Sequence, residues 1–131
     1  MAQSRSRGRF SSLKVSGPFQ SFVLAQLEDV GDVTSRAMFG GVGLYCGGVF
    51  FGIIARDVVY LKADDSNRGD YEARGMPAFT PYPDRTSTAK RSGAMGYYAV
   101  PVDILESAVD LEAWAKKSIA VARHAPSRSR R

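Results

Sequence analysis

The sequence predicts a two-layer α+β domain in which helices pack on a five-stranded antiparallel sheet. At 131 residues, with 44% hydrophobic and 24% charged side chains, the chain fits one globular domain. A strand-like middle, rich in valine, isoleucine, phenylalanine and glycine, lies between helical patterns near the two ends. The connections between the three strands expected within 37–63 are too short for parallel crossovers, so these strands should run antiparallel. The predicted order is helix, three strands, short helix, two strands and helix.

The first helix is expected at about 18–30. Ser16 and Pro18 suit a helix start, because serine caps free amides and proline loses nothing in the first turn. Apolar residues then recur at spacings of three and four, which is typical of an amphipathic helix. They are Phe19, Phe22, Val23, Leu27 and Val30. Gly31 follows where a left-handed residue commonly ends a helix.

Three strands are expected next, at 37–46, 49–55 and 58–63. Gly47 and Gly48 suit a two-residue hairpin turn, and a weaker polar break at 56–57 separates the second strand from the third.

The glycines within the first of these strands need a separate explanation. Gly40, Gly41 and Gly43 are costly in an ordinary strand. They indicate a bulge, a sharp bend or the close approach of a neighbour, and the pattern does not choose among the three.

The second half of the domain is expected to add two strands and two helices. A short helix is predicted at 66–74, a proline-flanked edge strand at 78–82, and a fifth strand at 95–100. Either of these two strands is a candidate edge for self-association, although the prolines also oppose such pairing.

A final helix follows, with a stripe formed by Leu111, Trp114, Ala115, Ile119 and Ala122. Asp103 and Glu106 have the spacing of a capping box, and Asp110 is a second candidate cap.

The net charge of +5 is concentrated at the two ends of the chain. Residues 1–14 hold four basic and no acidic side chains, and residues 116–131 hold six basic and none acidic. The residues between, 15–115, hold eight basic and all 13 acidic side chains, a net of −5. We therefore expect a folded domain at 16–123 between disordered basic tails at 1–15 and 124–131.

Composition also indicates a cytoplasmic protein. No apolar run approaches the length needed to cross a bilayer, and residues 1–10 do not resemble a secretory signal. The single cysteine, Cys46, excludes an internal disulfide and suits a reducing compartment.

No motif predicts catalysis, a cofactor or a metal. Residues 41–46 come near a dinucleotide fingerprint, but Cys46 replaces the third glycine and a strand follows where a helix is required. His124 is the only histidine, too few for an ordinary zinc site together with one cysteine. The acidic cluster of Glu28, Asp29 and Asp32 is expected to pair with Arg36. The chain is therefore predicted to be no enzyme.

Nucleic-acid contact is an alternative carried by basic side chains. The loop 84–93 combines hydroxyls with cations, a chemistry that suits phosphates. The candidate contacts are Arg85, Lys90, Arg91, Lys116, Lys117 and Arg123. Such cations also occur as solubilising surface charges, and the sequence leaves that alternative open.

Residues 34–45 (TSRAMFGGVGLY) resemble the signature of the N-terminal domain of TfoX/Sxy competence regulators. The similarity continues through 58–64 (VVYLKAD), 75–79 (GMPAF) and 96–101 (GYYAVP) to the helix of Trp114. It covers about 18–122 in the same order. Its signature positions are Arg36, Met38, Phe39, Gly40, Gly41 and Gly43.

The resemblance implies helices packed on an antiparallel sheet and a domain that often forms dimers. It implies no catalytic residues, and its glycines are expected to be structural. Full-length members add a helical domain and act as transcriptional co-activators; here we expect the first domain alone.

The leading hypothesis is a non-enzymatic regulatory or adaptor module that binds a protein partner, within a transcription complex, and forms a homodimer. The second is weak, largely non-specific DNA binding through the tails and the 85–91 loop. The third, an enzyme or small-molecule binder, would require a pocket.

Overall fold

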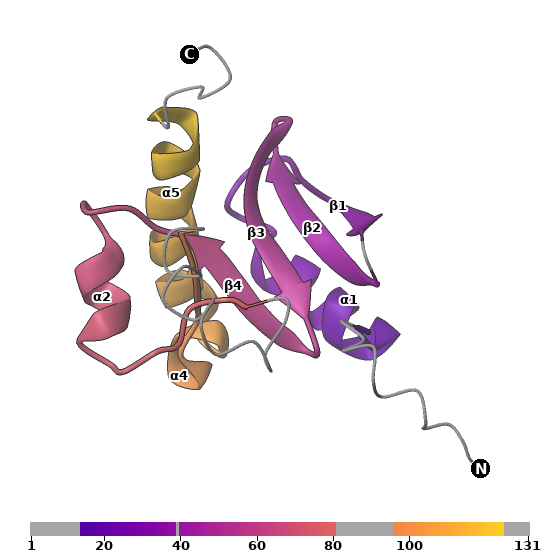
Figure 1. Cartoon of the computed structure of the whole chain (residues 1–131). Coiled ribbons are helices and arrows are strands. Elements are labelled where there is room, and N and C mark those ends of the chain that lie inside the picture. The colour runs from indigo at the N-terminus through magenta and orange to yellow at the C-terminus, as the bar shows by residue number, and fades with distance from the viewer. Residues whose placement is uncertain (1–13, 39, 81–95, 125–131) are drawn as a thin grey trace.

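The computed structural model describes residues 14–38, 40–80 and 96–124 (Figure 1). The helices are α1 (Gly17–Gln26), α2 (Arg68–Glu72), α4 (Val102–Leu105) and α5 (Ala108–His124). The strands are β1 (Val33–Met38), β2 (Gly41–Cys46), β3 (Val49–Ala55), β4 (Val58–Lys62) and β5 (Tyr97–Ala99). The expected tails lie almost entirely outside these residues.

The five strands form one antiparallel sheet in the order β1-β2-β3-β4-β5. Each strand therefore pairs with its neighbours in the sequence. The short connections among β1, β2, β3 and β4 require antiparallel pairing, whereas a longer segment that contains α2 joins β4 to β5. Together with the helices, this arrangement confirms the predicted α+β fold.

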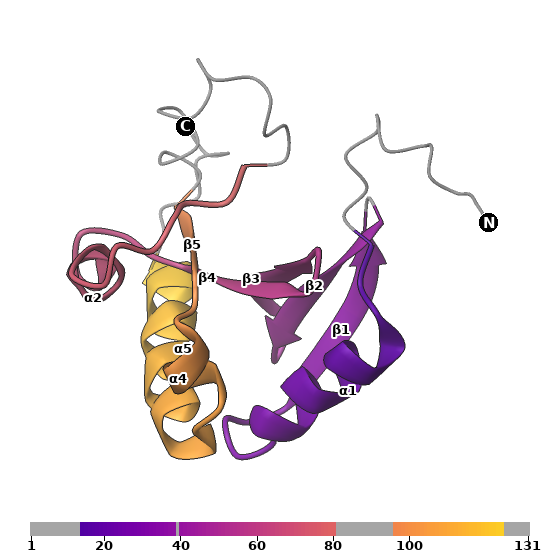
Figure 2. The same ribbon diagram turned by 90° about the horizontal axis from the view of Figure 1, so that it is seen from below.

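The helices cover one face of the sheet, which we call the inner face. Figure 2 shows α1, α4 and α5 on the same side of the curved sheet. Helix α5 packs on β3 and β4 and also contacts α1. Beneath the helices lie fully buried apolar side chains, among them Val23, Leu44, Ile54, Leu61 and Leu111. This cluster is the main hydrophobic core, and its burial is the principal driving force for folding.

The prediction of one strand at 37–46 was wrong, because the structure divides this segment between two strands. Strand β1 ends at Met38 and β2 begins at Gly41, with Met38 and Gly41 opposite each other. Gly40 lies in the turn with φ +85°, a value that favours glycine. Of the three explanations left open for the glycines, a sharp bend is therefore the correct one at Gly40.

The predicted edge strand at 78–82 was also wrong as a strand, within the residues that are described. Only Ala78 forms an isolated bridge, to Tyr98. The amide of Phe79 donates to the carbonyl of Tyr97 at 2.8 Å, and the amide of Ala99 donates to the carbonyl of Pro77 at 2.9 Å. Residues 77–79 thus lie along β5 and cover the side of that strand away from β4.

Two predicted caps were replaced by other contacts. Helix α5 begins after Ser107, whose hydroxyl accepts from the amide of Asp110, so Asp110 is not the cap. Asp103 instead binds Arg74 through two hydrogen bonds of 2.8 and 3.0 Å. That contact lowers the pKa of Asp103, because Arg74 stabilises the carboxylate. Only the cap on α1 formed as predicted, by Ser16.

A bulge in β3 sends one aromatic side chain to the inner face. Leu44 lies opposite Gly52 and Tyr45 opposite Phe50, so Phe51 is the extra residue. Phe51 is fully buried in the main core, whereas the neighbouring Phe50 belongs to the opposite face. The bulge therefore allows two successive phenylalanines to serve two different clusters.

Candidate interaction surfaces

The opposite face of the sheet, which we call the outer face, holds a second cluster of apolar side chains. Ile53, Ala55, Phe79 and Tyr97 are buried there, with Phe50 and Tyr60 packed against them at partial exposure. The rings of Tyr45 and Phe50 lie 5.1 Å apart, and those of Phe50 and Tyr97 lie 5.7 Å apart. The outer face is thus a connected aromatic surface.

Signature residues Arg36, Met38 and Gly43 lie on this outer face. The guanidinium of Arg36 is 5.7 Å from the centre of the Tyr45 ring, a cation–π contact, and the side chain is exposed. No ion pair joins Arg36 to the acidic cluster at 28–32 within the described residues, contrary to the sequence prediction.

Gly43 leaves room for the side chains around it. A β-carbon at this position would lie 2.8 Å from Cε of Met38 and 3.1 and 3.2 Å from ring carbons of Phe50 and Tyr45. Close approach therefore explains Gly43, as the sequence suggested. Gly41 is buried at the start of β2, and Phe39 lies outside the described residues.

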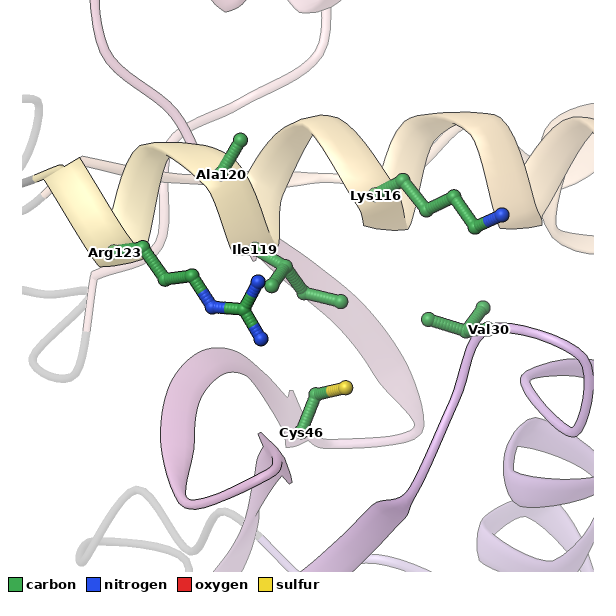
Figure 3. Close-up of a pocket in the computed structure, with 6 residues that line it drawn as sticks. All are labelled: Val30, Cys46, Lys116, Ile119, Ala120 and Arg123. Atoms are coloured by element: carbon green, nitrogen blue, oxygen red, sulfur yellow. The ribbon is translucent and has the colours of Figure 1, made fainter.

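A cavity of about 290 Å³ opens between α5, the end of β2 and the segment that joins α1 to β1. Figure 3 shows its lining by Val30, Cys46, Lys116, Ile119, Ala120 and Arg123. Cys46 is buried and packs into the main core, as a small apolar side chain does. The cavity combines an apolar floor with two cations, Lys116 and Arg123. These two residues lie two turns apart on the same face of α5.

The predicted nucleic-acid contacts on α5 are only partly available. Lys116 binds Glu112 at 2.8 Å, and this carboxylate raises the pKa of Lys116. Lys117 binds Asp70 at 2.9 Å. Arg123 is exposed and has no hydrogen-bond or ion-pair partner in the described part of the chain. The structure therefore brings Lys116 and Arg123 together and directs Lys117 towards α2. Arg85, Lys90 and Arg91 lie outside the described residues.

Within the part of the chain that the structure describes, one edge strand of the sheet is bordered by another segment of the chain, and the other edge strand is not. Strand β5 is bordered by residues 77–79, so the predicted self-pairing edge at 95–100 is occupied. Strand β1 pairs with β2 alone, and Thr34, Arg36 and Ala37 are exposed along it. Among the described strands, β1 is therefore the open edge.

The described residues contain neither a cluster of metal ligands nor a membrane-spanning helix. Within 14–38, 40–80 and 96–124, no three side chains of histidine, cysteine, aspartate or glutamate gather as metal ligands. No helix in these ranges is long and apolar enough to span a bilayer.

Sequence reasoning missed the outer-face rings of Tyr45, Phe50 and Tyr60. Tyr97 and Tyr98 lie on opposite faces of the sheet, since Tyr98 packs on Tyr71 in the main core. The signal that could have found the others is the strand alternation, combined with the absence of acidic residues from all five strands.

The family model described as the TfoX N-terminal domain matches residues 25–122, well over half of the chain. A comparison with curated proteins finds no match.

Proposed function

Because the chain belongs to the TfoX N-terminal domain family, a non-catalytic family of competence-related regulatory domains, we propose that it regulates through contact with another protein. The observation that carries this proposal is the open edge at β1. An exposed strand edge presents unpaired amides and carbonyls, which a second strand can pair with.

We place self-association at the same edge. Two copies of β1 related by a two-fold axis would join two sheets into one, and such symmetric pairing is the commonest form of dimer. Arg36 and Ala37 are exposed along this strand, so neither would need to leave the core. A partner within a transcription complex would use the same backbone groups.

Proline substitution at Ala37 tests the use of this edge. In a hairpin closed by two residues, Ala37 and Val42 form a pair without mutual hydrogen bonds, so the amide of Ala37 points away from β2. Ala37→Pro removes an outward donor, while Ala37→Ser retains it. We expect sedimentation equilibrium to show a dimer for the unmodified chain and Ala37→Ser, and a monomer for Ala37→Pro.

The regulatory role is tested in the source organism. Deletion of the gene should change the transcript levels of competence genes, and Ala37→Ser should restore them. Failure of Ala37→Pro to restore them would link regulation to the edge. Full restoration by a folded Ala37→Pro variant would contradict the proposed contact, and unchanged transcripts after deletion would contradict the regulatory role.

A further inference from the structure

The charge of the outer face differs from that of the rest of the described domain. The five strands carry no aspartate or glutamate, and every acidic residue in the described ranges lies in a helix, turn or loop. The cations of the strands, Arg36 and Lys62, both contact rings of the outer face. In a body whose residues 15–115 carry a net of −5, this face is a local surface of positive sign.

The rings and cations form one continuous track across the sheet. Arg36 lies 5.7 Å from the Tyr45 ring, which lies 5.1 Å from Phe50. The Phe50 ring lies 5.7 Å from Tyr97, and Nζ of Lys62 lies 4.9 Å from the Tyr97 ring. The track therefore crosses all five strands, about 19 Å at ordinary strand spacing, with a cation near each end.

Parts of this track are accessible to a ligand. Tyr45 and Phe50 are partly exposed, and Arg36 is exposed. Tyr97 is only 6% exposed and packs together with Ile53 against Phe50. Exposed rings on a supported sheet with cations beside them offer both stacking and phosphate contact.

We propose that the outer face binds single-stranded nucleic acid. Bases stack on Tyr45 and Phe50, and Arg36 and Lys62 contact the phosphates on either side. Sheets with exposed aromatic side chains stack about two or three bases in this way, and every base has a flat face to offer. A duplex buries those faces, so this surface selects single strands. An acidic peptide would use the cations but leave the rings without a planar partner.

Fluorescence anisotropy of the full chain with a labelled oligothymidine about 15 nucleotides long tests the proposal. We expect Tyr45→Ala to weaken binding about fivefold or more, because base stacking is lost, and Tyr45→Phe to retain it. We expect Arg36→Glu to weaken binding and to reduce the salt slope by about one, because a phosphate contact is lost.

Arg123→Glu is the matched control, since it reverses an exposed cation on α5, away from the outer face. It should change the affinity much less than Arg36→Glu. Circular dichroism and urea unfolding of each variant separate a lost contact from a lost fold. If Tyr45→Ala unfolds, Tyr45→Leu tests the stacking, because leucine fills much of the same space without a planar ring.

Four results would overturn the proposal. One is no binding of oligothymidine at low salt. Another is wild-type affinity in a folded Tyr45→Ala variant. Equal competition by polyglutamate would assign the face to acidic peptides. An equal loss of affinity for oligothymidine in Arg36→Glu and Arg123→Glu would indicate general charge attraction without a defined binding surface.

Discussion

The two faces of the sheet are formed by the same strands but differ in how deeply their side chains are buried and in charge. The inner face holds fully buried aliphatic side chains and Phe51 beneath α1 and α5. The outer face holds aromatic rings that cover one another only in part, with Arg36 and Lys62 beside them. Since stability follows buried apolar area, the inner face should determine folding. The outer face keeps exposed rings and charge, which are available for contact.

The largest test of this comparison uses two neighbouring residues of β3. Phe51→Ala should lower the free energy of unfolding by about 3–5 kcal/mol, because it empties a fully buried position. Phe50→Ala should cost about 1–2 kcal/mol, because the ring is already partly exposed. Urea unfolding measures both. Equal losses would show that the two faces contribute equally to stability.

Alkaline pH should lower the free energy of unfolding, because a buried tyrosine ionises on each side of the sheet. Burial raises the pKa of Tyr71, beneath α5, and of Tyr97, on the outer face, to about 12. In the unfolded chain both titrate near 10, so their contribution is complete below pH 10 and is lost as pH rises towards 12.

Each tyrosine should therefore reduce the free energy of unfolding by up to about 1.4 kcal/mol per pH unit in this window. Tyr71→Phe and Tyr97→Phe should each make the dependence shallower in urea unfolding at several pH values. We expect similar changes for the two variants, because burial raises both pKa values to about 12. An unchanged slope in both variants would contradict the assignment.

The smallest test compares a glycine on each face. A β-carbon at Gly52 would lie 3.1 Å from the backbone oxygen of Tyr60 as well as 3.0 Å from Leu61, so the backbone must shift. At Gly43 the nearest atom, at 2.8 Å, is the end of the flexible Met38 side chain. Gly52→Ala should cost about 1–3 kcal/mol and Gly43→Ala less, as judged by thermal unfolding. A larger loss at Gly43 would mean that the outer cluster is as rigid as the core.

Much of the fold could be predicted from local sequence pattern. The spacing from Phe19 to Leu27 and the Ser16 cap identified α1, and Gly47 and Gly48 identified the β2–β3 hairpin, where both have positive φ. The β1–β2 turn was missed, because Gly40 could be explained equally by a bulge within one strand. The pairing of residues 77–79 with β5 was missed as well, since it joins segments with no common local pattern.

The candidate surfaces were less predictable than the fold. Arg36 was expected to pair with nearby acids, but β1 places it over Tyr45 on the neighbouring strand. Lys116 and Lys117 were candidate nucleic-acid contacts, but Glu112 and Asp70 bind them separately. Contacts of this kind depend on where other elements lie, and residue type alone does not decide them.

By itself, the sequence determined the fold class, the family and the lack of acidic residues in the strands, because these follow from composition and from the order of local patterns. Only the tertiary structure decided which rings meet on the outer face. That outcome depends on the register between strands, and a shift of one residue moves a side chain to the other face. The bulge at Phe51 makes such a shift within β3. It separates Phe50 from Phe51, and so separates the contact surface from the core.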